Sequence, residues 1–201
     1  MALLKTSALG LKPGRRTWWL LAWLAAVGAW LSGGPGVSAQ VAAAREYQIK
    51  AVFLFNFAQF VDWPPAAFPD ATSPLVIGVL GDDPFKGYLD ETVRGETVNN
   101  RPIVVQRFRR VEEIAACHVL FVSRSETSRL EQILAGLKDR SILTVGDDED
   151  FARRGGMIRF VTDNNKVRLR INVNAAKAAK LTISSKLLRP AEIVTSGKDQ
   201  P

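Results

Sequence analysis

The chain of 201 residues carries 27 Lys and Arg against 20 Asp and Glu, is 47% hydrophobic and holds one Cys. This apolar fraction is ordinary for a folded domain, so composition excludes a disordered chain, and the single Cys excludes a disulfide scaffold. The net charge of +7 is concentrated at the start, because residues 40–201 hold 23 bases against 20 acids. So small a surplus does not favour nucleic-acid binding.

Residues 1–39 have the pattern of an export signal. Arg15 and Arg16 precede an uncharged apolar run over 18–31, which is shorter than the roughly 20 residues of a membrane-spanning helix. Small residues predict cleavage after Ala39. The adjacent arginines leave two routes open, general secretion and twin-arginine export. We expect the chain to leave the cytoplasm and to lose this segment.

The remaining residues, 40–201, predict one α/β domain. An apolar stretch over 42–62 predicts a helix that ends before Pro64. After it, short apolar runs alternate with helical patterns, which predicts a mostly parallel sheet with helices on both faces. Strands are expected over 75–80, 102–108, 118–123 and 141–145, and helices or helical turns over 84–95, 111–116, 127–138 and 148–154.

The last third of the chain predicts an antiparallel hairpin. Residues 157–162 and 166–173 flank an Asp-Asn-Asn turn. In the second of these strands apolar and charged residues alternate, so we expect it to be half-buried and at or near a sheet edge. Two helical segments follow, 174–180 with Asn174 as its cap, and 184–188.

Few residues suit catalysis. His118 is the only histidine, and it and Cys117 point to opposite faces of a strand, so they cannot form a nucleophile–base pair. Cys117 lies in an apolar run and is expected to be buried. The sequence also has no nucleophile elbow and no phosphate-binding glycine loop. A hydrolase that uses Ser123, Ser184 or Ser185 would have no visible base other than the lone histidine. We therefore expect a protein that is not an enzyme and has no catalytic, cofactor-binding or metal-binding residues.

Acidic residues follow two of the predicted strands. Asp82 and Asp83 come after the first strand, and Asp147 begins an acidic run after the fourth. Ligands of open α/β sheets bind at the carboxyl ends of the strands, which makes Asp82, Ser123 and Asp147 the candidates for a small-molecule site. The alternative is that these acids cap the helices that follow, as Asp83 would for the helix over 84–95.

The predicted first helix is nearly apolar all round, which indicates that it is enclosed or that one side meets a partner. Its polar side chains form one narrow stripe with apolar neighbours. The candidates for a partner contact are Val52, Phe55, Asn56, Gln59 and Trp63. Alternatively, the Pro-rich residues 64–74 fold over the apolar members of this set.

A second candidate surface is the outer side of the predicted hairpin, where basic residues alternate with apolar ones. These residues, the basic stripe, are Arg159, Lys166, Arg168 and Arg170. The basic stripe could contact an acidic protein or anionic lipid. The alternative is that its charges protect an edge strand from aggregation.

Five blocks of the sequence, in the same order along the chain, resemble the YfiR-type periplasmic proteins. They are 46–64, 77–85, 117–122, 155–158 and 183–188. The resemblance covers about residues 46–190 and implies a single α/β domain without enzymatic activity. It also implies a periplasmic protein that holds a membrane-bound diguanylate cyclase inactive by binding the sensor domain of that enzyme. Release would raise cyclic-di-GMP and favour biofilm formation.

The resemblance leaves several points open. Similar domains are fused to sensor kinases, so a kinase is a second possibility for the partner, and a homodimer also stays open. The lone Cys117 departs from members with paired cysteines, which puts control through an intramolecular disulfide in doubt. The alternative function is a periplasmic small-molecule binding protein that presents its ligand to a membrane receptor.

Overall fold

The computed structural model describes residues 35–164 and 166–195. Most of the predicted export signal lies outside the described residues, and the predicted cleavage point after Ala39 falls within helix α2 (Pro35–Phe60). Contacts divide the chain into two units, Met1–Ala42 and Ala43–Pro201, and the fold below is that of the second. In the described ranges we find no helix with the length and apolar character needed to cross a membrane.

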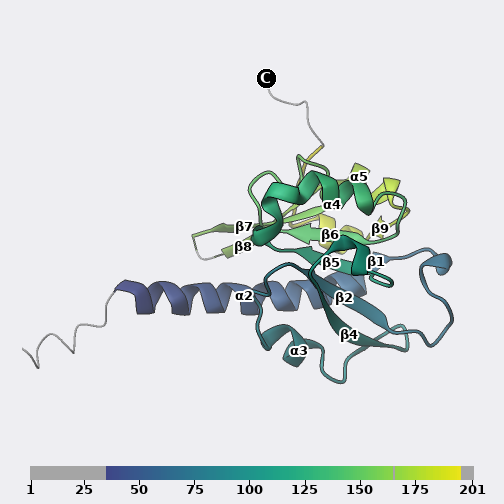
Figure 1. Cartoon of the computed structure of the whole chain (residues 1–201), viewed down its shortest axis with the longest axis horizontal. Helices are drawn as coiled ribbons and strands as arrows, with labels where there is room; N and C mark the ends of the chain where they lie inside the picture. The colour runs from purple at the N-terminus through teal and green to yellow at the C-terminus, as the bar shows by residue number, and fades with distance from the viewer. Residues whose placement is uncertain (1–34, 165, 196–201) are drawn as a thin grey trace, which may run out of the picture. The chain divides into compact units, whose positions relative to one another are not determined.

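An eight-stranded sheet carries the fold of the second unit (Figure 1). In spatial order its strands are β10 (Glu192–Ile193), β8 (Lys166–Ile171), β7 (Ile158–Asp163), β6 (Leu143–Gly146), β5 (Val119–Val122), β2 (Leu75–Leu80), β4 (Arg101–Phe108) and β3 (Thr97–Val98). Neighbouring strands are parallel except for the antiparallel pairs β7–β8 and β3–β4. The predicted parallel sheet and its C-terminal hairpin are thus confirmed. β8 lies next to the edge strand β10, as the alternation of its residues predicted.

Helices cover both faces of the sheet. The α-helices after α2 are α3 (Tyr88–Val93), α4 (Leu130–Gly136), α5 (Val173–Ala178) and α6 (Ser185–Leu188). One core packs the buried side of α2 onto the sheet, where the Phe57 ring stacks on Phe160 with centroids 5.8 Å apart. The opposite core packs Leu130 of α4 against Leu120 and Phe151. Both cores exclude water from apolar side chains, which is the main stabilising contribution to such a fold.

The first helix ends two residues earlier than the sequence predicts. Val61–Asp62 forms strand β1, which pairs antiparallel with β9 (Thr182–Ile183). The amide of Ser184 extends this contact by donating to the carbonyl of Phe60 over 2.9 Å. The end of α2 is therefore fixed to the C-terminal third of the chain.

Several predicted helices are shorter in the structure. The helix expected over 84–95 spans only Tyr88–Val93, and Asp83 does not cap it. The carboxylate of Asp83 instead accepts a hydrogen bond from the amide of Phe85 over 2.8 Å. The segment expected over 127–138 is split into the 3₁₀ helix η3 (Arg124–Arg129) and α4. A 3₁₀ turn, η2 (Val111–Glu113), replaces the short helix over 111–116, whereas the helical turn predicted over 148–154 is present as hydrogen-bonded turns.

The predicted cap of α5 is also wrong by two residues. Asn172, rather than Asn174, is the N-cap, and its side-chain oxygen accepts from the amide of Ala175 over 3.0 Å. Ser184 caps α6 in the same way by accepting from the amide of Lys186 over 3.3 Å. In both cases the side chain satisfies an amide that the helix leaves without an internal partner.

Candidate docking surface and the polar network beneath it

One side of α2 faces solvent and carries apolar side chains. Ile49 is 43% exposed and Val52 is 48% exposed, and they lie three residues apart on the same side of the helix. At about 100° per residue these two share a stripe with four polar residues. We call the stripe the outer α2 face, and its members are Arg45, Gln48, Ile49, Val52, Asn56 and Gln59.

The structure separates the five predicted contact residues into two groups. Val52 and Gln59 are exposed and Asn56 is half-buried, so these three lie on the outer α2 face. Phe55 and Trp63 are half-buried and pack against the core. Sequence reasoning missed Ile49, although its spacing of three from Val52 was a visible signal.

Trp63 contacts His118 and thereby joins the segment after α2 to the sheet. Its indole Nε1 donates to the carbonyl of His118 over 3.2 Å, and the Phe68 ring stacks on the imidazole with centroids 4.2 Å apart. The His118 Nδ1 accepts from the amide of Val76 over 3.0 Å, so the neutral ring carries its hydrogen on Nε2 and donates to Ala67. Burial lowers the pKa of His118. The segment 64–74 thus packs on His118 beside Trp63, while Val52 stays exposed.

A cavity of about 90 Å³ opens beside this aromatic group. Trp63, Phe68 and Arg101 contribute to its wall, together with Asp62. The Arg101 guanidinium lies 3.9 Å from the centroid of the Phe68 ring, and its Nη1 donates to two backbone carbonyls. These contacts hold the loop after α2 on the sheet.

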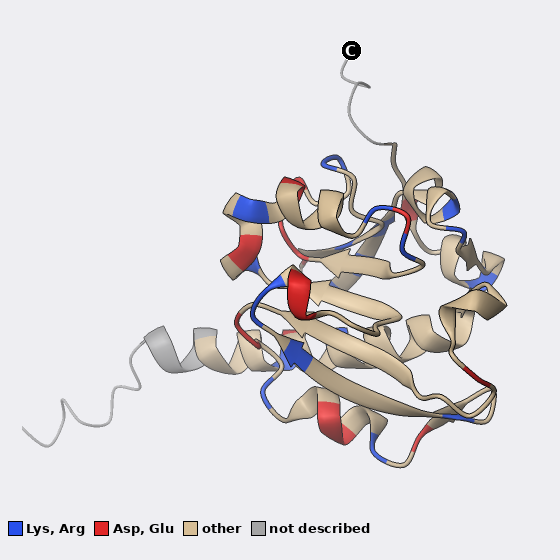
Figure 2. Cartoon of the chain, turned by 45° about the vertical axis from the view of Figure 1, so that its right-hand side comes forward, with Lys and Arg blue, Asp and Glu red and all other residues tan. Residues whose placement is uncertain are grey.

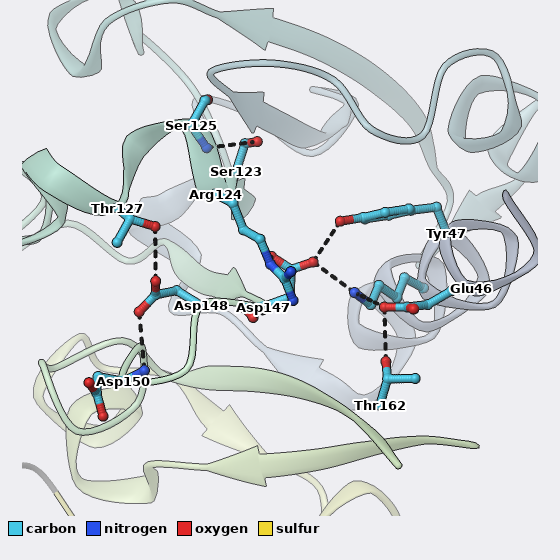
Figure 3. Close-up of polar contacts among 11 residues, drawn as sticks. Glu46, Tyr47, Ser123, Arg124, Ser125, Thr127, Asp147, Asp148, Asp150 and Thr162 are labelled. Carbon is cyan, nitrogen blue, oxygen red and sulfur yellow. Dashed lines mark hydrogen bonds and ion pairs between the residues drawn. The ribbon is translucent and has the colours of Figure 1, made fainter. Parts of the chain in front are cut away.

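A buried ion pair anchors the middle of α2 in the second unit, and Figure 3 shows the polar contacts around Asp147. The Lys50 Nζ donates to Oδ2 of Asp147 over 2.7 Å, and both side chains are closed to solvent. The Tyr47 hydroxyl donates to the same oxygen over 2.8 Å, and the Arg124 Nε donates to Oδ1 over 3.2 Å. Glu46 lies 2.6 Å from the Lys50 Nζ. Asp147 is thereby surrounded by donors from α2 and η3.

The charge of Lys50 determines the ionisation of Asp147. Burial is the largest influence and raises the pKa of Asp147, but the charge of Lys50 and the hydrogen bonds from Lys50 and Tyr47 outweigh it, so the pKa lies below its ordinary value. Burial and the nearby carboxylate raise the pKa of Tyr47, which keeps the phenol protonated. The network therefore holds α2 against the end of β6. Its central contact is the Lys50–Asp147 ion pair, and the Tyr47 hydroxyl and the exposed Arg124 guanidinium donate the other hydrogen bonds to the carboxylate. Sequence reasoning did not identify Lys50, Tyr47 or Arg124.

The three residues proposed for a small-molecule site do follow neighbouring strands, but protein groups occupy the space between them. Gly81 packs so closely on the next loop that a Cβ there would meet Ser125 at 2.4 Å. The Ser125 hydroxyl accepts from the amide of Asp82 over 3.0 Å, and Ser123 caps η3. Lys50 also binds Asp147, so side chains and loops of the protein itself fill this edge of the sheet.

Two members of the basic stripe form ion pairs with acidic residues. Arg170 pairs with Glu192 of β10 over 2.8 Å, and Arg168 lies 3.8 Å from Asp163. Arg159 lies directly opposite Arg170 in the register of β7 and β8, and its buried Nε has no hydrogen-bond partner. Burial and the like charge of Arg170 lower the pKa of Arg159. These pairs favour the edge-protecting interpretation for most of the stripe.

Cys117 and His118 lie on opposite sides of the sheet, as the sequence predicts. Cys117 belongs to the core beneath α4, and its Sγ donates to the carbonyl of Val119 over 3.2 Å. Burial raises the pKa of the Cys117 thiol to about 12. The thiol is therefore protonated and inert at neutral pH.

Taken together, the described residues define a mostly parallel α/β domain with an exposed helix stripe whose centre is apolar. A family model described as YfiR/HmsC-like matches residues 47–192. The chain belongs to the YfiR/HmsC-like family, which comprises periplasmic regulatory proteins. A search of curated proteins found no match.

Proposed function

We propose that this protein binds the periplasmic sensor domain of an inner-membrane diguanylate cyclase and restrains the enzyme without catalysing a reaction itself. Family membership supports a periplasmic regulator, and the outer α2 face supplies a surface for the contact. Ile49 and Val52 give this face an apolar centre, and the surrounding side chains are mostly uncharged amides. An exposed apolar centre with a polar rim is typical of a protein interface.

The mechanism is a shift in the population of receptor states. A regulator changes a two-state receptor only by the difference in its affinity for the two states. Moving the receptor from almost fully active to almost fully inactive requires a preference of about 10⁴ for the inactive state. The buried Lys50–Asp147 pair holds the middle of α2 and the β1–β9 pairing holds its C-terminal end, so its outer face is presented in one orientation.

A titration against the periplasmic domain of a membrane diguanylate cyclase from the same genome tests this proposal. The double variant Ile49→Asp/Val52→Asp is expected to bind at least about tenfold more weakly, because two carboxylates enter the apolar centre. Ile193→Asp is the matched control, since Ile193 is 53% exposed but lies on β10. Native affinity of the double variant would show that another surface makes the contact.

A further inference from the structure

A run of cations without acids distinguishes the C-terminal third of the chain. Between Asp163 and Glu192 the sequence holds seven Lys and Arg residues and no Asp or Glu. Three of the seven belong to the basic stripe. We call the other four, which are all exposed, the basic cap, and its members are Lys177, Lys180, Lys186 and Arg189.

The basic cap comes from two short helical segments, and Figure 2 shows the Lys and Arg residues of the chain in blue. Lys177 is the last residue but one of α5 and Lys180 follows that helix by two residues, while Lys186 lies in α6 and Arg189 is its C-cap. Arg189 keeps a helical backbone conformation three residues after Lys186, so these two side chains point to the same side of the turn. β9 connects the two helices and pairs with β1, so the basic cap adjoins the end of α2.

The cations of the basic cap are not neutralised by acidic side chains within the part of the chain that the structure describes. None of the four cations has an ion-pair partner among residues 35–164 and 166–195, whereas Arg168 and Arg170 of the basic stripe each have one. Lys180 also has a left-handed backbone conformation, with φ of 62°. Glycine is usual at such a position after a helix, because a Cβ is unfavourable there. Lys180 therefore holds a position at which its side chain adds backbone strain.

We propose that the basic cap binds the anionic phospholipid headgroups of a membrane surface. Three of its four cations are lysines, whose flexible point charges suit a diffuse layer of phosphates better than the planar pairing of Arg with a carboxylate. Each Lys or Arg near an anionic surface strengthens binding about fivefold. The biological setting rests on the proposed function, because a membrane receptor would keep the protein at the bilayer, but lipid binding itself needs no receptor.

Cosedimentation with vesicles tests this proposal on the exported protein recovered from the periplasm. Vesicles of phosphatidylcholine with phosphatidylglycerol should bind the protein in a salt-sensitive manner, and pure phosphatidylcholine vesicles should not. Changing Lys177, Lys180, Lys186 and Arg189 to Gln should weaken binding at least about tenfold. The control carries four exposed cations changed to Gln elsewhere, Lys86, Arg94, Arg109 and Lys138, and has the same net charge and N terminus.

Three outcomes would overturn the proposal. The first is that the native protein does not bind the anionic vesicles, and the second is that both sets of substitutions weaken binding equally. The third is that the basic cap strengthens binding to an isolated acidic receptor domain but not to lipid, which would make the partner a protein. Vesicle binding without affinity for any cyclase domain would contradict only the proposed function, so the two hypotheses fail separately.

Discussion

Lys50 and Asp147, 97 residues apart in the sequence, form a 2.7 Å ion pair that is closed to solvent. The pair joins α2 to the end of β6, and Tyr47 and Arg124 complete the hydrogen bonds of the carboxylate. A buried charge is tolerated only when it is paired and hydrogen-bonded. The pair therefore holds the middle of α2 on the sheet, and the β1–β9 pairing fixes its C-terminal end.

Replacing Lys50 by Met should destabilise the protein by about 3–5 kcal/mol, because Asp147 would be left buried without its main countercharge. The double variant Lys50→Met/Asp147→Leu should lose less, since no unpaired charge remains. Urea unfolding at neutral pH measures both free energies. Arg124→Gln is the control and should cost less than about 1 kcal/mol, because the Arg124 side chain is 67% exposed. A single variant as stable as this control would contradict the structural role of the pair.

Protonation of His118 should destabilise the fold below neutral pH. The Nδ1 of His118 accepts from the amide of Val76, and burial lowers the pKa of His118 below its ordinary value of 6.5. The nearby positive charge of Arg101 acts in the same direction. The unfolded chain therefore takes up a proton before the folded one, so the free energy of unfolding falls as the pH drops through 6.5 towards the lowered pKa.

Urea unfolding between neutral pH and the range in which carboxylates titrate measures this effect. The slope attributable to His118 should approach but not exceed about 1.4 kcal/mol per pH unit. His118→Asn removes the titrating group while an amide oxygen can still accept from the backbone, so its stability should vary less with pH. Equal pH dependence in the two proteins would show that His118 titrates alike in the folded and unfolded chains.

Lys177 inside α5 and Lys180 just after it should respond to glycine with opposite signs. Lys180 has a φ of 62°, so Lys180→Gly should stabilise the protein by up to about 1 kcal/mol by relieving the left-handed strain. Lys177 lies inside α5, and Lys177→Gly should destabilise by about 1 kcal/mol. Both variants lose one positive charge, so thermal unfolding compares backbone effects at equal charge.

Cys117 should be unreactive in the folded protein. Burial raises the pKa of its thiol to about 12, so thiolate is scarce at neutral pH and the sulfur is shielded from reagents. A chromogenic disulfide reagent should label the native protein far more slowly than the urea-unfolded protein. Rapid labelling of the native protein would indicate an accessible thiol and would reopen redox control through Cys117.

Much of the fold could be predicted because local patterns carry it. The run Leu75–Leu80 is buried at every position, and the alternation in Lys166–Ile171 reports one buried face. Short pieces held by distant partners could not be predicted. Val61–Asp62 continues the helical pattern of α2 but becomes a strand because β9 pairs with it.

In the candidate site, too, local spacing predicted some features, and contacts between distant segments could not be predicted. Helical spacing identified Val52, Asn56 and Gln59 as residues of one surface, and the structure places them on the outer α2 face. Spacing alone could not reveal that Trp63 donates to His118, or that Asp147 is held by Lys50. Both contacts join segments more than fifty residues apart, and no local pattern in the sequence encodes them.

Cellular cyclic-di-GMP in a strain that lacks this protein tests the central claim most directly. We predict that loss of the protein raises cyclic-di-GMP and that the native protein or Ile193→Asp restores the lower level. Ile49→Asp/Val52→Asp, exported in equal amount, should fail to restore it. An unchanged level in the strain without the protein would contradict the claim that it restrains a diguanylate cyclase.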